Sequence, residues 1–150
     1  YEFGFGKSYS DFSYSDMKLS SSTFKNNLIV AVKVTNTGKV AGKEIVQLYL
    51  SAPNKMIDKP KAELKAFAKT KELKPGESQL ITMELKPEDL ASFVTAQSSW
   101  IAEAGNYKIS VGASSLDVKQ SADFQLNQNI VVKKVQPVFK ADKEFTDLKN

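Results

Sequence analysis

The side chains in this 150-residue sequence that could take part in chemistry are almost all carboxylates and lysines. There are 17 Asp and Glu residues and 21 cationic residues, but no His and no Cys. Without His the chain lacks the usual general base and the commonest metal ligand. Without Cys it lacks thiol nucleophiles, disulfides and Cys-ligated zinc. Every cationic residue is Lys, so the bidentate Arg clamps that bind phosphates and carboxylates are also missing.

The carboxylates show no arrangement typical of a catalytic or metal site. Catalysis by two carboxyl groups requires that they face each other across a cleft, and 17 acidic residues offer pairs at many spacings. Glu88 and Asp89 follow Pro87, which is the pattern of a first helical turn. Asp11 and Asp16 have no acidic partner at the spacing of a calcium loop. A serine nucleophile would lack its base, so we predict no catalytic, cofactor-binding or metal-binding residue.

Short segments with apolar residues at every second position dominate the sequence, as expected for half-buried strands. The clearest of these segments are residues 28–34, 44–51, 80–85, 107–111 and 118–126. Residues 64–73 are a weaker extended stretch, and Pro and Gly turn signals separate the segments. About seven short strands with regular turns predict an all-β fold, a two-sheet antiparallel β-sandwich. An open barrel is the alternative.

The same alternation predicts which side chains fill the space between the two sheets. They should be aliphatic residues with one Tyr: Leu28, Val30, Val32, Val34, Val46, Leu48, Leu50, Ile81, Met83, Leu85, Tyr107, Ile109 and Val111. Tyr49 and Gln47 are predicted to point outward from their strand. Tyr107 follows Gly105 at a strand start and is interpreted as a structural corner tyrosine.

We divide the chain into three parts. Residues 1–16 form an aromatic, Gly- and Ser-rich segment, interpreted as an interdomain linker that docks on another domain through its rings: Tyr1, Phe3, Phe5 and Tyr9. Residues 17–126 form the sandwich. Residues 127–150 form a tail, in which residues 130–132 either add an edge strand or lie across the domain, and the charged end is frayed.

Trp100, the sole Trp, has two interpretations. Exposed, it could be a stacking platform for a sugar, and buried or partly buried it would be part of the core, which is the reading we favour. The net charge of +4 comes from lysines scattered among the carboxylates. Such a mixed-charge surface argues against a nucleic-acid partner. No apolar run reaches the roughly 20 residues needed to span a bilayer, so no membrane insertion is expected.

Five phrases of the sequence resemble, in order, phrases of the family-three glycoside hydrolases. Tyr1 to Ser10 is similar to their Y-P-F-G-Y-G-L-S-Y-T, although Glu2 and Lys7 depart from it. The other four are similar to V-x-N-T-G-x-x-x-G-x-E-V-V-Q-L-Y at 34–49, R-P-x-K-E-L-K-G-F at 59–67, L-x-P-G-E at 73–77 and G-x-Y-x-x-x-V-G-A-S-S at 105–115. Ala104 also departs, standing where a Pro is frequent. The resemblance covers residues 1 to about 126.

The resemblance implies a C-terminal fibronectin type III-like domain of a β-glucosidase or β-xylosidase, which cleaves terminal non-reducing β-glycosidic bonds in carbohydrate metabolism. In that family the nucleophilic Asp and the acid/base Glu lie in upstream domains, so no residue here inherits a catalytic role. The implied function is a non-catalytic structural module that packs against and stabilises the catalytic domains of the same polypeptide. The alternative is a carbohydrate-binding module for oligosaccharides, using Trp100 or Tyr49. The family also implies a periplasmic or secreted location.

Overall fold

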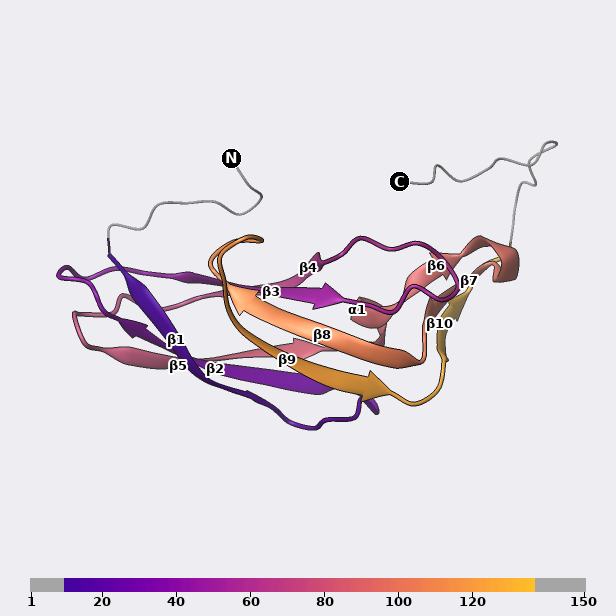
Figure 1. Ribbon diagram of the computed structural model, residues 1–150, viewed down its shortest axis with the longest axis horizontal. Coiled ribbons are helices and arrows are strands. Elements are labelled where there is room, and N and C mark those ends of the chain that lie inside the picture. Colours follow the sequence, from indigo (N-terminus) through magenta and orange to yellow (C-terminus); the bar gives the residue numbers. More distant parts are fainter. Residues whose placement is uncertain (1–9, 137–150) are drawn as a thin grey trace.

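The computed structural model describes residues 10–136, which form two facing antiparallel sheets and a third, smaller one (Figure 1). The first sheet has the strand order β1-β2-β5, made of β1 (Phe12–Leu19), β2 (Leu28–Asn36) and β5 (Ser78–Leu85). The second has the order β4-β3-β8-β9, made of β4 (Glu63–Lys69), β3 (Ile45–Ser51), β8 (Gly105–Gly112) and β9 (Val118–Leu126). These seven strands are the predicted sandwich.

The third sheet, in the order β10-β7-β6, raises the total to ten strands instead of about seven. It is made of β6 (Ser92–Val94), β7 (Ser99–Ala102) and β10 (Ile130–Lys134), together with the helix α1 (Pro87–Leu90) and the 3-10 turn η1 (Thr95–Gln97). Its strands have three to five residues, too few for alternation to reveal them. The small sheet lies at one end of the sandwich, opposite the end where the described chain begins (Figure 1).

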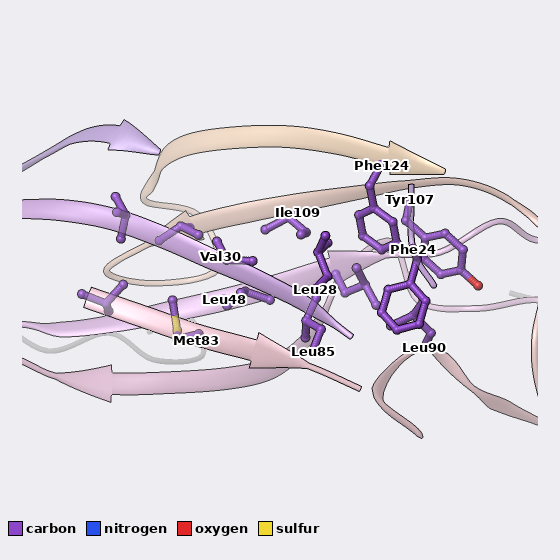
Figure 2. Close-up of a cluster of buried hydrophobic side chains, with 14 of the residues drawn as sticks. Phe24, Leu28, Val30, Leu48, Met83, Leu85, Leu90, Tyr107, Ile109 and Phe124 are labelled. Atoms are coloured by element: carbon purple, nitrogen blue, oxygen red, sulfur yellow. The ribbon is translucent and has the colours of Figure 1, made fainter. Parts of the chain in front are cut away.

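The strand β2 shows how the sequence builds the core. Its alternate residues Leu28, Val30, Val32 and Val34 are fully buried, and those between them face outward. In β5, Ile81, Met83 and Leu85 are buried in the same way. Side chains from both sheets meet between the layers (Figure 2), so the predicted inner faces are confirmed.

Three aromatic rings close one end of the core. Tyr107 stacks on Phe124 with 5.1 Å between ring centroids, and Phe24 tilts against Phe124 at 6.0 Å (Figure 2). The Tyr107 hydroxyl donates a hydrogen bond of 2.8 Å to the carbonyl of Glu103, which explains why this ring can be buried. Tyr107 is therefore the structural tyrosine that its position predicts, whereas Phe24, in the loop after β1, gave no such signal.

One boundary differs from the sequence-based division. Residues 12–16, predicted as linker, belong to β1, where Phe12 lies opposite Asn36 and Tyr14 lies opposite Val34 of β2. A β-bulge, with Asp16 at a φ of 53°, interrupts the pairing and hides the alternation of this strand. Residues 130–132 do form an edge strand, since β10 pairs with β7. Within residues 10–136, no helix has the length and apolar composition needed to cross a bilayer.

Candidate interdomain surfaces

The side chain of Asn36 joins the start of the described chain to the sandwich. Its amide oxygen accepts hydrogen bonds from the Ser10 hydroxyl at 2.7 Å and the Gly38 N–H at 2.9 Å. Its amide nitrogen donates to the carbonyls of Val40 and Leu73, each at 2.8 Å. Asn36 is fully buried, and these four bonds satisfy both ends of its amide.

Gly38 is required at this junction because the chain crosses directly over it. The carbonyl of Asp11 accepts hydrogen bonds from the N–H groups of Thr37, at 2.8 Å, and Gly38, at 3.2 Å. A Cβ at residue 38 would lie 2.0 Å from the Ser10 hydroxyl and 2.7 Å from the Asp11 nitrogen. The sequence predicts Asn36-Thr37-Gly38 as a turn; the structure adds that the phrase fixes how residues 10 and 11 approach the domain.

The outer face of the β4-β3-β8-β9 sheet brings together residues that are far apart in the sequence. The strand registers place one row of side chains across all four strands: Phe67, Gln47, Gly112 and Val118. The adjacent row consists of Leu64, Tyr49, Ser110 and Ser121. We call this surface, with Ile45 on the same side of β3, the β3 outer face.

Polar groups at the centre of the β3 outer face bond to one another. The Tyr49 hydroxyl donates to the amide oxygen of Gln47, and the Gln47 amide nitrogen donates to the carbonyl of Ala113 at 2.8 Å. A Cβ at Gly112 would lie 2.0 Å from the carbonyl oxygen of Asp117, since the turn after β8 folds back over this glycine. Gln47 and Tyr49 are both buried, so Tyr49 is not the exposed sugar platform that the alternative reading required.

Apolar side chains surround that polar centre and are open. Phe67 is 72% exposed, one of the most exposed large apolar side chains among the described residues, and Ile45 and Val118 are close to half exposed. The outer face of the β1-β2-β5 sheet is different, because charged and hydroxyl side chains alternate across it: Ser15, Lys33, Thr35, Ser78, Thr82 and Glu84. Its open aliphatic residues are Ile29 and Leu80.

Trp100 lies on the small sheet and is 44% exposed. It is paired across the strands with Phe93 on one side and Lys133 on the other. The Trp100 and Phe93 rings are 5.6 Å apart with a tilt of 57°. The two rings therefore form a partly open aromatic pair that is bent, with no single flat surface.

A buried ion pair that the sequence did not reveal fixes the loop between β3 and β4. The Glu103 carboxylate, which is 1% exposed, lies 2.6 Å from the Lys59 ammonium and also accepts from the N–H groups of Lys55 and Met56. Burial by itself would raise the pKa of this carboxyl, but the hydrogen bonds from Lys59 and the two N–H groups outweigh it and lower the pKa below its usual value. Glu103 therefore stabilises the conformation of the β3–β4 loop.

Comparison with known families and structures shows which family of domains this sandwich belongs to. The family description "Fibronectin type III-like domain" matches residues 44–115, from the residue before β3 to the turn after β8. The chain contains a fibronectin type III-like domain. The match includes the whole polar centre of the β3 outer face, whereas Asn36 and the small-sheet strand β10 lie outside it.

This fibronectin type III-like domain is similar to one segment of much longer proteins. The solved structure of β-glucosidase 3B from Thermotoga neapolitana aligns with 89% of the chain at 45% identity, with a TM-score of 0.82 and 18% of its own length covered. A β-glucosidase from Kluyveromyces marxianus aligns with 89% of the chain at 36% identity, with a TM-score of 0.79 and 16% of its length covered. A curated β-glucosidase of Bacteroides ovatus is 41% identical over 130 residues, covering 85% of the chain.

The chain spans 17–18% of the length of such curated relatives, including β-glucosidase A of Butyrivibrio fibrisolvens, to which it is 37% identical over 153 aligned positions. The predicted docking residues of the fibronectin type III-like domain, Tyr1, Phe3, Phe5 and Tyr9, lie outside the described residues. The structure brings together Gln47, Phe67 and Gly112, which the sequence did not identify as a group. Each came from a separate phrase of the resemblance, and only strand register shows that they share a row.

Proposed function

We propose that the chain is a non-catalytic structural module, which packs against and stabilises the catalytic domains of a family-three glycoside hydrolase. The observation that carries this proposal is the alignment of 85–90% of the chain with only 17–18% of β-glucosidases. By that similarity, the parent polypeptide hydrolyses terminal non-reducing β-glycosidic bonds, and a periplasmic or secreted location is the corresponding expectation.

The roles of the best-placed carboxylates support a structural function. Glu103 holds the β3–β4 loop through Lys59. Asp89 accepts a hydrogen bond of 2.7 Å from the Lys86 N–H and thereby caps α1, as the Pro87-Glu88-Asp89 pattern predicts. Glu77 accepts from the Lys71 ammonium and the Lys74 N–H in a tight turn. Each of these groups has a structural partner that accounts for its position.

The test compares the parent polypeptide with a version that ends before Ser10. We expect the shortened protein to unfold at a lower temperature, and to lose β-glucosidase activity faster on heating, because its catalytic domains lose a packing partner. Unchanged thermal inactivation would contradict the proposal. In a separate assay, the 150-residue chain alone should not hydrolyse an aryl β-glucoside, and measurable turnover would overturn the non-catalytic assignment.

A second candidate, binding of an oligosaccharide, is favoured by one observation: Trp100 is 44% exposed beside Phe93. Aromatic rings with one open face are common at binding surfaces. Titration of the chain with gluco- and xylo-oligosaccharides, monitored by Trp fluorescence, tests this function. A saturable change that is absent in Phe93→Ala would support it, whereas no change would leave the structural module as the sole function.

A further inference from the structure

We propose that the β3 outer face is the surface on which this domain contacts the catalytic part of its parent polypeptide. The inference rests on the proposed function and assigns a surface to it. The partner is the polypeptide that precedes this domain in the parent. Its contact area should be apolar opposite Phe67 and Ile45 and acidic next to Lys69, whereas Lys108 at the other margin is paired across the strands with Asp123.

The first argument is that three phrases of the glycoside-hydrolase resemblance meet on this face. Gln47 and Tyr49 come from the phrase that ends in β3, Phe67 ends the phrase in β4, and Gly112 begins the turn at the end of the phrase in β8. Aliphatic residues within the same phrases, such as Leu48 and Val111, are buried in the core, and core packing explains why these positions are aliphatic. Core packing does not explain Phe67, because its side chain points away from the core.

The second argument is the open apolar area. A Phe ring that is 72% exposed leaves most of its surface in water, and removing apolar surface from water is favourable by roughly 25 cal/mol per Å². Phe67, Ile45 and Val118 lie around a centre whose polar groups are already hydrogen-bonded, so covering it requires few new polar contacts. The Lys33 and Glu84 side chains on the opposite sheet would have to be desolvated for that face to dock.

The third argument is the position of Ser10, which joins the domain to the polypeptide before it. Ser10 is held by Asn36 and lies against Gly42, where an added Cβ would be 3.4 Å from the Ser10 Cβ. Gly42 lies three residues before β3, so the preceding polypeptide reaches the domain at the start of the central strand of this face. The small sheet, with Trp100, lies at the far end of the sandwich (Figure 1). Continuity of the chain therefore favours the β3 outer face over the aromatic pair.

Single cysteines can test the assignment, because the chain itself contains none. Phe67→Cys places a thiol on the β3 outer face, and Leu80→Cys places a matched control on the opposite sheet, where Leu80 is 62% exposed. The rate of maleimide labelling of each thiol is measured in the 150-residue chain and in the whole parent polypeptide. Mass spectrometry of the labelled peptide separates these thiols from any others in the parent.

We expect Phe67→Cys to react at least about tenfold more slowly in the parent than in the 150-residue chain, and Leu80→Cys to react within about twofold in both. Slowing of Leu80→Cys instead would overturn the assigned face while leaving the packing function in place. Equal labelling rates for both thiols in both proteins would also rule out the β3 outer face as the contact surface. The packing function would then be tested separately by the parent polypeptide that ends before Ser10. If Phe67→Cys is slow in the 150-residue chain and speeds up when residues 1–9 are deleted, the occupant is that segment, and the proposed partner is wrong.

Discussion

The central strands of the two main sheets, β2 and β3, differ in how their two faces are used. Along β2, buried and open residues alternate over the whole strand. Along β3, every residue from Val46 to Leu50 is buried. The inner faces are equivalent, since both fill the core, but the outer face of β2 meets water, whereas that of β3 has buried polar side chains and an apolar border. One sandwich therefore has a solvent face and a face suited to contact.

The largest expected effect on stability concerns the inner faces of β2 and β3, which both fill the core. Leu48→Ala should lower the free energy of unfolding by about 2–5 kcal/mol, because it leaves a cavity in a fully buried site. Leu80→Ala, on the open side of β5, should change it by less than about 0.5 kcal/mol. Urea denaturation of the 150-residue chain measures both. A loss below 1 kcal/mol for Leu48→Ala would mean that β3 does not form the core.

The second prediction separates the two outer faces. Gln47→Ala removes partners from the Tyr49 hydroxyl and the Ala113 carbonyl, so we expect a loss of about 1–3 kcal/mol. Lys33→Ala, at the outward position in the middle of β2, is the matched control and should fall within about 0.5 kcal/mol of the unmodified chain. Equal effects of the two substitutions would show that the outer face of β3 is as solvated as that of β2.

The inner faces could be predicted from the sequence, because a period of two residues is a local signal. The outer face of β3 could not be fully predicted, although Gln47 and the Tyr49 hydroxyl are the sole polar side-chain groups of residues 45–50, and near-continuous apolar runs are typical of strands covered on both faces. The sequence correctly placed Tyr49 on the outer side. Its hydroxyl bonds to Gln47, whose amide nitrogen in turn donates to the carbonyl of Ala113, 66 residues along the chain, and no local pattern reports such a neighbour.

The junction and the buried ion pair were missed for the same reason. Ser10 and Asn36 are separated by 26 residues and Lys59 and Glu103 by 44, so nothing in the spacing of these residues indicates contact. The strand β1 was partly missed because aromatic and Ser residues continue from the first segment into it. The sequence shows a turn signal at Asn36-Thr37-Gly38. That the same turn forms hydrogen bonds with Ser10 and Asp11 depends on tertiary structure.

The smallest expected effect concerns two carboxylates that precede the strands of different sheets, Glu44 before β3 and Glu77 before β5. Burial, and secondarily the nearby Asp117, raise the pKa of Glu44. Hydrogen bonds from Lys71 and from the Lys74 N–H lower the pKa of Glu77, whose side chain is partly exposed. Protonation of Glu44 thus favours the folded state, whereas protonation of Glu77 opposes it.

The two carboxylates should therefore respond to substitution with opposite signs. The contribution of Glu44 is favourable below its unfolded pKa, about 4.3, and is lost as the pH rises through its higher folded pKa. The contribution of Glu77 is present above a pH of about 4.3 and is lost as the pH falls through its lower folded pKa.

Glu44→Gln should raise the unfolding temperature at pH 7 and have little effect on it near pH 4. Glu77→Gln should lower the unfolding temperature at pH 7. Calorimetric scans at the two pH values measure both changes. A destabilised Glu44→Gln at pH 7 would mean that the hydrogen bond from the Ile45 N–H to the Glu44 carboxylate outweighs burial, so that the two carboxylates act with the same sign.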